Sequence, residues 1–160
     1  LAGKALTVDA ENWMAHKGTA SVILNIFRHY KTPPHFIILS GDVHYSFVYD
    51  VRLRFRRNSP KITQFTCSGI KNTFPNTLIR CLDTLNQWFY SARSPLNIFT
   101  RRRNMSVHDR HPDCAPNQAL LNRAAIGQLL IDPDCEEVRC LALCSDGETV
   151  EFPPESDVDN

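Results

Sequence analysis

The stretch HFIILSGDVHYSF, residues 35–47, sets the expectations for the fold. Its apolar run over 36–40 is too short for a helix and rich in residues that favour strands. It therefore predicts a strand buried on both faces, inside a parallel or mixed sheet. Asp42 and His44 follow directly, and residues two apart in extended chain point to the same side. We expect both side chains to face one pocket at the carboxyl end of this strand, where open α/β sheets bind ligands.

The segments on either side predict an α/β fold. Apolar residues at helical spacing predict a helix over 18–31, which Pro33 and Pro34 end. Strict alternation predicts a strand over 46–56 with Asp50 on its water-exposed face. The other expected elements are, in chain order, a strand over 61–67, a helix over 76–92, a long loop over 94–119, and strands over 126–132, 137–145 and 149–152. We expect a mixed sheet with flanking helices, closed by an antiparallel hairpin.

Composition and charge indicate a single domain and give no reason to expect nucleic acid or a membrane as a partner. The chain has 160 residues, of which 42% are hydrophobic and 22% charged, enough for one domain with a sizeable core. A net charge of +1 gives no reason to expect nucleic acid as a partner. No apolar run of about 18 residues occurs, so no membrane span is expected. The first residues lack both Met and a signal-peptide hydrophobic region, and we expect them to be the interior of a longer chain.

The six cysteines indicate whether the protein works in a reducing or an oxidising cellular compartment. They are scattered among apolar, core-like segments instead of forming the pattern of a short secreted scaffold. We therefore expect free, buried thiols in a reducing compartment, which favours the cytoplasm.

Asp42 and His44 are candidate metal ligands. A carboxylate oxygen with an imidazole nitrogen suits iron, zinc or manganese, and calcium less well. Two side chains do not complete a shell of four to six donors, so further ligands would have to come from elsewhere. The alternative is a hydrogen bond between Asp42 and His44 with only a structural role.

The segment ILSGDVHYS, residues 38–46, resembles the C-terminal metal-binding motif of PhoD-like alkaline phosphatases, members of the calcineurin-like metallophosphoesterase superfamily. The likeness extends over most of residues 9–152. It includes AENWMAHKGTASVIL (10–24), KITQFTCSGIKN (61–72), and IGQLLID (126–132) with LCSDGETVEF (143–152). The resemblance implies that residues 1–152 are the C-terminal part of a metallophosphatase domain, with residues 153–160 an acidic tail or linker.

The resemblance also implies a reaction. Members of this family hydrolyse phosphomonoesters or phosphodiesters at a site of two metal ions, and the acid and imidazole of the motif are ligands, here Asp42 and His44. The metals could be iron, calcium, manganese or zinc. The family's other ligands lie in motifs N-terminal to this region, and residues 1–8 do not contain them. We therefore expect a C-terminal fragment that lacks its N-terminal half as a partner and is inactive alone. The alternative is a non-enzymatic α/β interaction domain with a structural Asp42–His44 pair.

Three further groups are weaker candidates. His16 precedes the first expected helix and could border the site as a catalytic residue. Arg101, Arg102 and Arg103 could bind a substrate phosphate, because guanidinium groups match phosphate oxygens. A zinc site could combine His108, His111 and Cys114 with Cys135, Cys140 or Cys144. Cys140, Ala142 and Cys144, however, share one strand face, which is a core pattern.

Overall fold

The computed structural model describes residues 17–41, 44–54, 59–67, 81, 84, 105–132 and 138–154. The chain divides into two compact units, residues 1–34 and residues 35–160. Of the described residues in the expected second helix over 76–92, Cys81 and Thr84 are helical, and the rest of that prediction lies outside these ranges. No described helix is long and apolar enough to span a membrane.

The first unit contains helix α1, Lys17–Arg28, which confirms the predicted helix. Leu24 and Phe27 are buried, whereas Ile26 and Tyr30, also expected on the apolar stripe, are exposed. The helix ends three residues earlier than expected, because the chain turns before Pro33 and Pro34. The Thr32 hydroxyl donates to the carbonyl oxygen of Ile26 at 2.9 Å, satisfying one of the last carbonyls of the helix.

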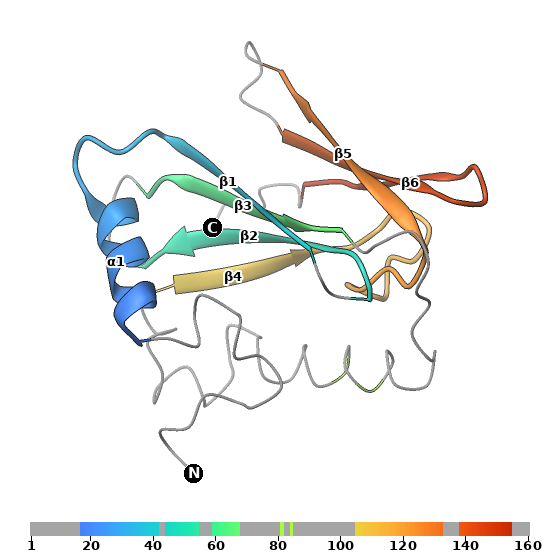
Figure 1. Cartoon of the computed structure of the whole chain (residues 1–160), viewed down its shortest axis with the longest axis horizontal. Coiled ribbons are helices and arrows are strands. Elements are labelled where there is room, and N and C mark those ends of the chain that lie inside the picture. Colours follow the sequence, from blue (N-terminus) through green and yellow to red (C-terminus); the bar gives the residue numbers. More distant parts are fainter. Residues whose placement is uncertain are drawn as a thin grey trace. The chain divides into compact units, whose positions relative to one another are not determined.

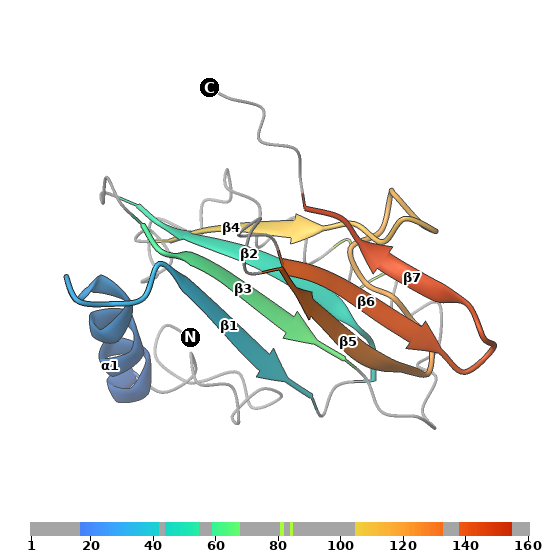
Figure 2. The same ribbon diagram turned by 90° about the horizontal axis from the view of Figure 1, so that it is seen from above.

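The second unit contains two sheets (Figures 1 and 2). The first sheet has strands in the order β1-β3-β2-β4, formed by β1 (His35–Ser40), β2 (Phe47–Leu53), β3 (Lys61–Thr66) and β4 (Met105–Arg110). It is mixed, because β1 and β3 are parallel while β2 is antiparallel to both of its neighbours. The second is antiparallel, formed by β5 (Ala125–Ile131), β6 (Val138–Cys144) and β7 (Thr149–Phe152). The predicted mixed sheet and terminal hairpin are thus confirmed. The predicted flanking helices are supported only in part, because helices are sparse in the described residues and a second sheet packs against the first.

The hairpin between β6 and β7 follows from its turn residues. Gly147 has a φ of 88°, a conformation that L residues rarely adopt, and the Asp146 carboxylate accepts a hydrogen bond from the Glu148 backbone N–H at 3.1 Å. The sequence Asp-Gly thus sets the turn that joins the last two strands.

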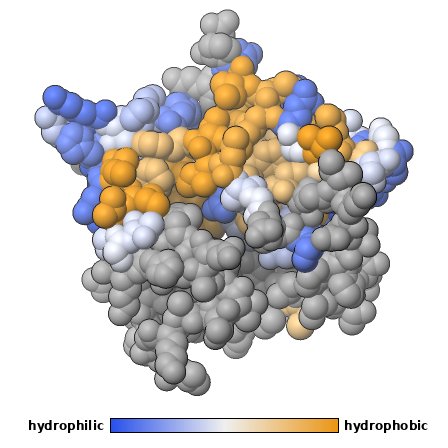
Figure 3. Space-filling model, in the orientation of Figure 1, coloured by the Kyte–Doolittle hydropathy of each residue, from blue (hydrophilic) through white to orange (hydrophobic). Residues whose placement is uncertain are grey.

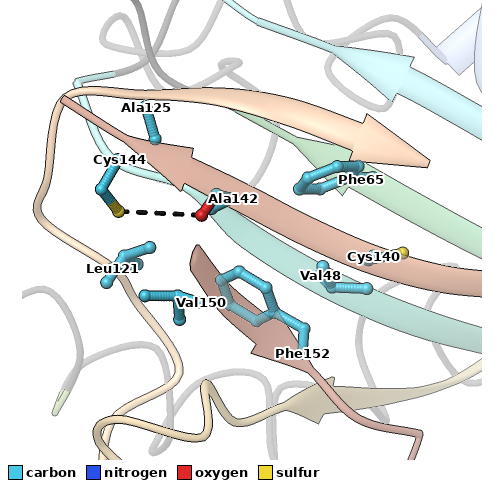
Figure 4. Close-up of a cluster of buried hydrophobic side chains, with 9 residues drawn as sticks. All are labelled: Val48, Phe65, Leu121, Ala125, Cys140, Ala142, Cys144, Val150 and Phe152. Atoms are coloured by element: carbon cyan, nitrogen blue, oxygen red, sulfur yellow. Dashed lines mark hydrogen bonds between the residues drawn. The ribbon is translucent and has the colours of Figure 1, made fainter. Parts of the chain in front are cut away.

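The hydrophobic core lies between the two sheets (Figure 4). Val48 and Phe65 of the first sheet meet side chains of the second, and the Phe65 and Phe152 ring centroids are 6.3 Å apart. The second sheet contributes Ala125, Cys140, Ala142, Cys144, Val150 and Phe152. The face predicted for the core on β6 is therefore confirmed. The cysteines within the described ranges, Cys67, Cys81, Cys114, Cys140 and Cys144, are all free, as expected. The expected burial holds for Cys140 and Cys144 but is wrong for Cys81 and Cys114, which are exposed, while Cys67 is half-buried.

Gly127 marks where the two sheets approach closely. A Cβ atom at this position would lie 2.9 Å from Cε1 of Phe65 and 3.0 Å from Cβ of Cys67. A residue other than glycine would therefore collide with β3 or the residue that follows it, so β5 lies directly against β3.

The predicted burial of β1 is wrong. In the described part of its sheet β1 is an edge strand, and Leu39 is 68% exposed although its register partner Phe65, on the same face, is 3% exposed. The reason is that the three-stranded sheet overlies β2 and β3 and does not extend over β1 (Figure 2). Figure 3 shows apolar residues exposed together on one face, and Ile126 and Ile131 of β5 are also more than half exposed.

The predicted loop over 94–119 is wrong in part, because it contains strand β4. The prediction of a water-exposed face on β2 is wrong in part: Arg52 is exposed as expected, but Val48 is fully buried and Asp50 is directed at Arg110. Nε and Nη2 of Arg110 donate to the two Asp50 carboxylate oxygens at 2.7 and 3.0 Å. This ion pair allows both charged residues to face the second sheet.

Arg110 also joins the two sheets. Its side chain is 6% exposed, and Nη1 donates to the carbonyl oxygens of Val138 at 3.0 Å and Phe152 at 3.4 Å. The Thr63 hydroxyl donates to Asp50 Oδ1 at 3.0 Å. One buried guanidinium thus connects β4 to β2, β6 and β7.

Candidate functional site

The carboxyl ends of β1 and β3 lie side by side. The strands are parallel and in register, so Ser40 pairs with Thr66 and the chain leaves both strands at the same edge. The β1 chain continues into Gly41 and the Asp42–His44 motif, and the β3 chain continues into Cys67. Loops after neighbouring parallel strands form ligand sites in open α/β sheets, which makes this edge the candidate site.

Polar side chains gather at this edge. The Ser40 and Thr66 hydroxyl groups hydrogen-bond to each other, and Gln64 Nε2 lies 3.4 Å from Ser40 Oγ and 3.5 Å from Thr66 Oγ1. The Cys67 backbone N–H donates to the Ser40 carbonyl oxygen at 3.3 Å. Hydroxyl and amide groups thus extend the pairing of β1 and β3 to the last residue of each strand.

The chain returns from the motif at Ser46, which is fully buried. The Ser46 backbone N–H and carbonyl oxygen each hydrogen-bond to Leu121 at 2.8 Å. The Ser46 hydroxyl donates to Cys67 Sγ at 3.5 Å, and the Cys67 thiol donates to the Ala125 carbonyl oxygen at 3.4 Å. Ser46 and Ser40 flank the motif, and both contact Cys67.

The predicted site residues are described only in part. His44 lies just beyond the candidate edge with its imidazole exposed, as a ligand open to solvent would be. Asp42, His16, Arg101, Arg102 and Arg103 lie outside the described residues, and so does the predicted proximity of Asp42 to His44. The prediction that the motif follows directly on a strand end is confirmed.

The described residues do not contain a complete set of metal ligands. No three His, Cys, Asp or Glu side chains within them gather closely enough to hold a metal ion. The zinc site considered for His108, His111 and Cys114 is therefore not formed with Cys140 or Cys144. Burial raises the pKa of the Cys140 thiol to about 11, which favours the neutral thiol over the thiolate that binds zinc. Cys135 lies outside the described residues.

Two features of this region escaped prediction. The Ser40, Gln64 and Thr66 cluster depends on the register of β1 with β3, and nothing local in the sequence specifies which strands pair. The Asp50–Arg110 pair joins residues 60 positions apart. The one feature of the sequence that could have indicated the pair is the position of Asp50 two residues after Val48. Both side chains then lie on one face of β2, so a buried Val48 implies that Asp50 needs a partner.

The comparisons with known proteins provide no further assignment. No family model, no curated protein and no solved structure matches the chain.

Proposed function

We propose that the chain is the C-terminal part of a metal-dependent phosphatase or phosphodiesterase of the PhoD-like, calcineurin-like metallophosphoesterase type. The observation that carries the proposal is the parallel, in-register pairing of β1 with β3. It makes Gly41, which leads into the Asp42–His44 motif, and Cys67, which follows β3, neighbours at one sheet edge, where ligand sites form in α/β folds. The exposed imidazole of His44 supports it, because a ligand must be accessible.

In this proposal Asp42 and His44 donate a carboxylate oxygen and an imidazole nitrogen to a two-metal site. Such a site of iron, calcium, manganese or zinc lowers the pKa of a bound water and neutralises charge on the phosphate oxygens. The remaining ligands belong to a preceding part of the protein. Arg101, Arg102 and Arg103 would contact the phosphate, and His16 would border the site.

The finer architecture belongs to the same proposal. The two facing sheets would be the C-terminal portion of a layered metallophosphoesterase fold, comprising residues 1–152, with 153–160 a tail or linker. The position of β1 at the edge of its sheet, among the strands that the structure describes, supports this arrangement, because further strands could pair at a sheet edge. The free thiols support a cytoplasmic location.

The test uses the longer protein that contains this segment, assayed with p-nitrophenyl phosphate and bis(p-nitrophenyl) phosphate and analysed for bound metal. Asp42→Ala and His44→Ala are each expected to reduce kcat at least about a hundredfold and to remove bound metal. Asp113→Ala and His108→Ala are matched controls, since both replaced side chains are exposed. Activity and metal content that survive both motif substitutions would exclude the proposal.

A binding domain without catalysis is the second candidate. The exposed apolar side chains of Leu39, Ile126 and Ile131 favour it, because surfaces of this kind are used to contact other proteins. In that case the Asp42→Ala protein would keep its metal content, which would be low from the start, and neither phosphate ester would be hydrolysed. The same measurements therefore separate the two functions.

A further inference from the structure

Thr66 and Cys67 contact both ends of the segment that carries the Asp42–His44 motif. At the entering end, Thr66 bonds to Ser40 through its hydroxyl, and the Cys67 backbone N–H donates to the Ser40 carbonyl oxygen. At the leaving end, the Cys67 thiol accepts from the Ser46 hydroxyl. Two adjacent residues at one strand end therefore contact both Ser40 and Ser46, and the backbone bonds of Ser46 to Leu121 hold the leaving end as well.

Thr66 and Cys67 are themselves held firmly. Thr66 is 1% exposed, and its hydroxyl has Ser40 and Gln64 as neighbours on the same sheet face. The Cys67 thiol donates to Ala125 of the second sheet, and its Cβ lies against Gly127. Cys67 is thus held by contacts with the second sheet, whereas Thr66 is held by its neighbours within the first sheet.

Fixing both ends of a short segment restricts the conformations available to the residues within it. Metal ligands and catalytic groups work best when surrounding residues hold their geometry before the ligand binds. A threonine hydroxyl and a cysteine thiol suit this role, because they form hydrogen bonds without placing a charged side chain beside the metal ligands.

We propose that Thr66 and Cys67 are positioning residues that hold Ser40 and Ser46, on either side of the motif, and thereby position His44 for binding a metal ion. The metal part of this inference rests on the proposed function. The positioning part stands on the hydrogen bonds of Ser40 and Ser46 and is measurable without any metal.

The first experiment measures amide hydrogen exchange of the 160-residue chain. Thr66→Val, which removes the hydroxyl and keeps the shape, is expected to speed exchange in residues 44–46 about tenfold, while β6 and β7 exchange as before. Thr66→Ser is expected to exchange like the unsubstituted protein, because it restores the hydroxyl. Thr149→Val is the matched control, since Thr149 is exposed in β7. Unchanged exchange at 44–46 in Thr66→Val overturns the proposal, and so does an equal increase across β6 and β7.

A second variant guards against a failure of Thr66→Val to fold. Cys67→Ala removes the thiol that contacts Ser46 but keeps the backbone bond to Ser40, and it is expected to speed exchange at 44–46 at least as much as Thr66→Val does, because Cys67 is the residue in contact with Ser46. Exchange in Cys67→Ala that matches the unsubstituted protein would remove Cys67 from the proposal.

The final experiment separates this inference from the proposed function. Manganese(II) is titrated while the ring protons of His44 are followed by NMR, which reports metal near the imidazole through broadening. We expect Thr66→Val to need about tenfold more manganese than Thr66→Ser for the same broadening. The titration uses the longer protein that contains this segment. If His44 does not broaden there, or Asp42→Ala broadens equally, the proposed metal site fails. The exchange result then still decides whether Thr66 and Cys67 hold the segment.

Discussion

At the scale of single residues, Arg110 connects the two sheets, a role that no pattern in the sequence predicted. Its guanidinium neutralises Asp50 with two short hydrogen bonds and also binds carbonyl oxygens of the opposite sheet. A buried charge is tolerated only when it is paired and hydrogen-bonded, and removal of one partner leaves the other charge buried alone.

We expect Arg110→Met to lower the free energy of unfolding by about 3–5 kcal/mol, because it leaves the Asp50 carboxylate without its cation. Arg139→Met is the control, since Arg139 pairs with Glu151 at 2.7 Å on the surface and its loss should cost about 1 kcal/mol or less. Urea unfolding followed by circular dichroism measures both. Combining Arg110→Met with Asp50→Leu should recover most of the loss, and a double variant as unstable as Arg110→Met would contradict this account.

Cys140 provides a prediction about pH. Burial raises its pKa from 9.0 to about 11, so the folded protein keeps this proton at pH values where the unfolded chain loses it. The resulting stabilisation is complete below pH 9 and is lost as the pH rises through 11. The difference in unfolding free energy between the unsubstituted protein and Cys140→Ala should therefore shrink between pH 9 and pH 11. A difference that is constant over this interval would show that the thiol does not titrate as described.

Cys140 and Arg110 also show what single residues reveal in advance. The burial of Cys140 was predictable, because Cys140, Ala142 and Cys144 repeat at the two-residue period of a strand. The burial of Arg110 was not, because its partner lies 60 residues away and arginine is rarely buried without one.

At the scale of elements, the sequence predicts best where one face of a strand or helix is clearly apolar. The helix at Lys17–Arg28 and the strands β1, β2, β3, β5, β6 and β7 lie where periodicity placed them. Strand β4, MSVHDR, was missed because four of its six residues are polar or charged, and Asp109 breaks the alternation that Met105 and Val107 begin. Its position is set instead by pairing with β2, which is a tertiary effect.

Gly127 tests the close approach of β5 to β3. We expect Gly127→Ala to lower the free energy of unfolding by about 1–3 kcal/mol, because the new methyl group would collide with Phe65 and Cys67. Gly41→Ala is the comparison, since its Cβ would lie 3.8 Å from the Cys67 carbonyl oxygen, an ordinary contact. That change should stay within about 0.5 kcal/mol. Equal losses for the two variants would mean that the packing between the sheets adjusts easily at Gly127.

At the scale of the whole molecule, sequence patterns stop short because burial depends on which layers overlap. The apolar run of β1 correctly predicted a strand in a mixed sheet, but its exposure depends on how far the three-stranded sheet extends. The candidate site, like β1, was predicted only in part. The strand end before Asp42 and His44 follows from the sequence, whereas the neighbouring Thr66 and Cys67 follow only from the strand order.

Leu39 and Phe65 are register partners on one sheet face with opposite exposure, and they should respond differently to substitution. We expect Leu39→Lys to leave the Tm within about 2 °C of its original value, because the side chain is already in water. It should also raise the concentration at which the protein stays soluble. Phe65→Ala should cost about 3–5 kcal/mol through the cavity that it leaves.

Differential scanning calorimetry measures the changes in Tm and stability, and ultracentrifugation measures the highest concentration at which each variant stays soluble. Gln128→Lys is the control for added charge alone, since Gln128 is exposed and uncharged. Solubility that rises equally in both lysine variants would assign the gain to charge and not to removal of the apolar side chain.

The separation of Asp50 from Arg110 has a consequence for synthesis on the ribosome. The anion leaves the exit tunnel 60 residues ahead of its cation, which at about 5–20 residues per second is a delay of about 3–12 s. During that interval β1, β2 and β3 have been translated, yet the carboxylate must stay hydrated, so the face around Val48 cannot close. The nascent chain therefore waits for its own C-terminal half, and chaperones have their longest opportunity to bind it before the second sheet, residues 125–152, emerges and covers this face.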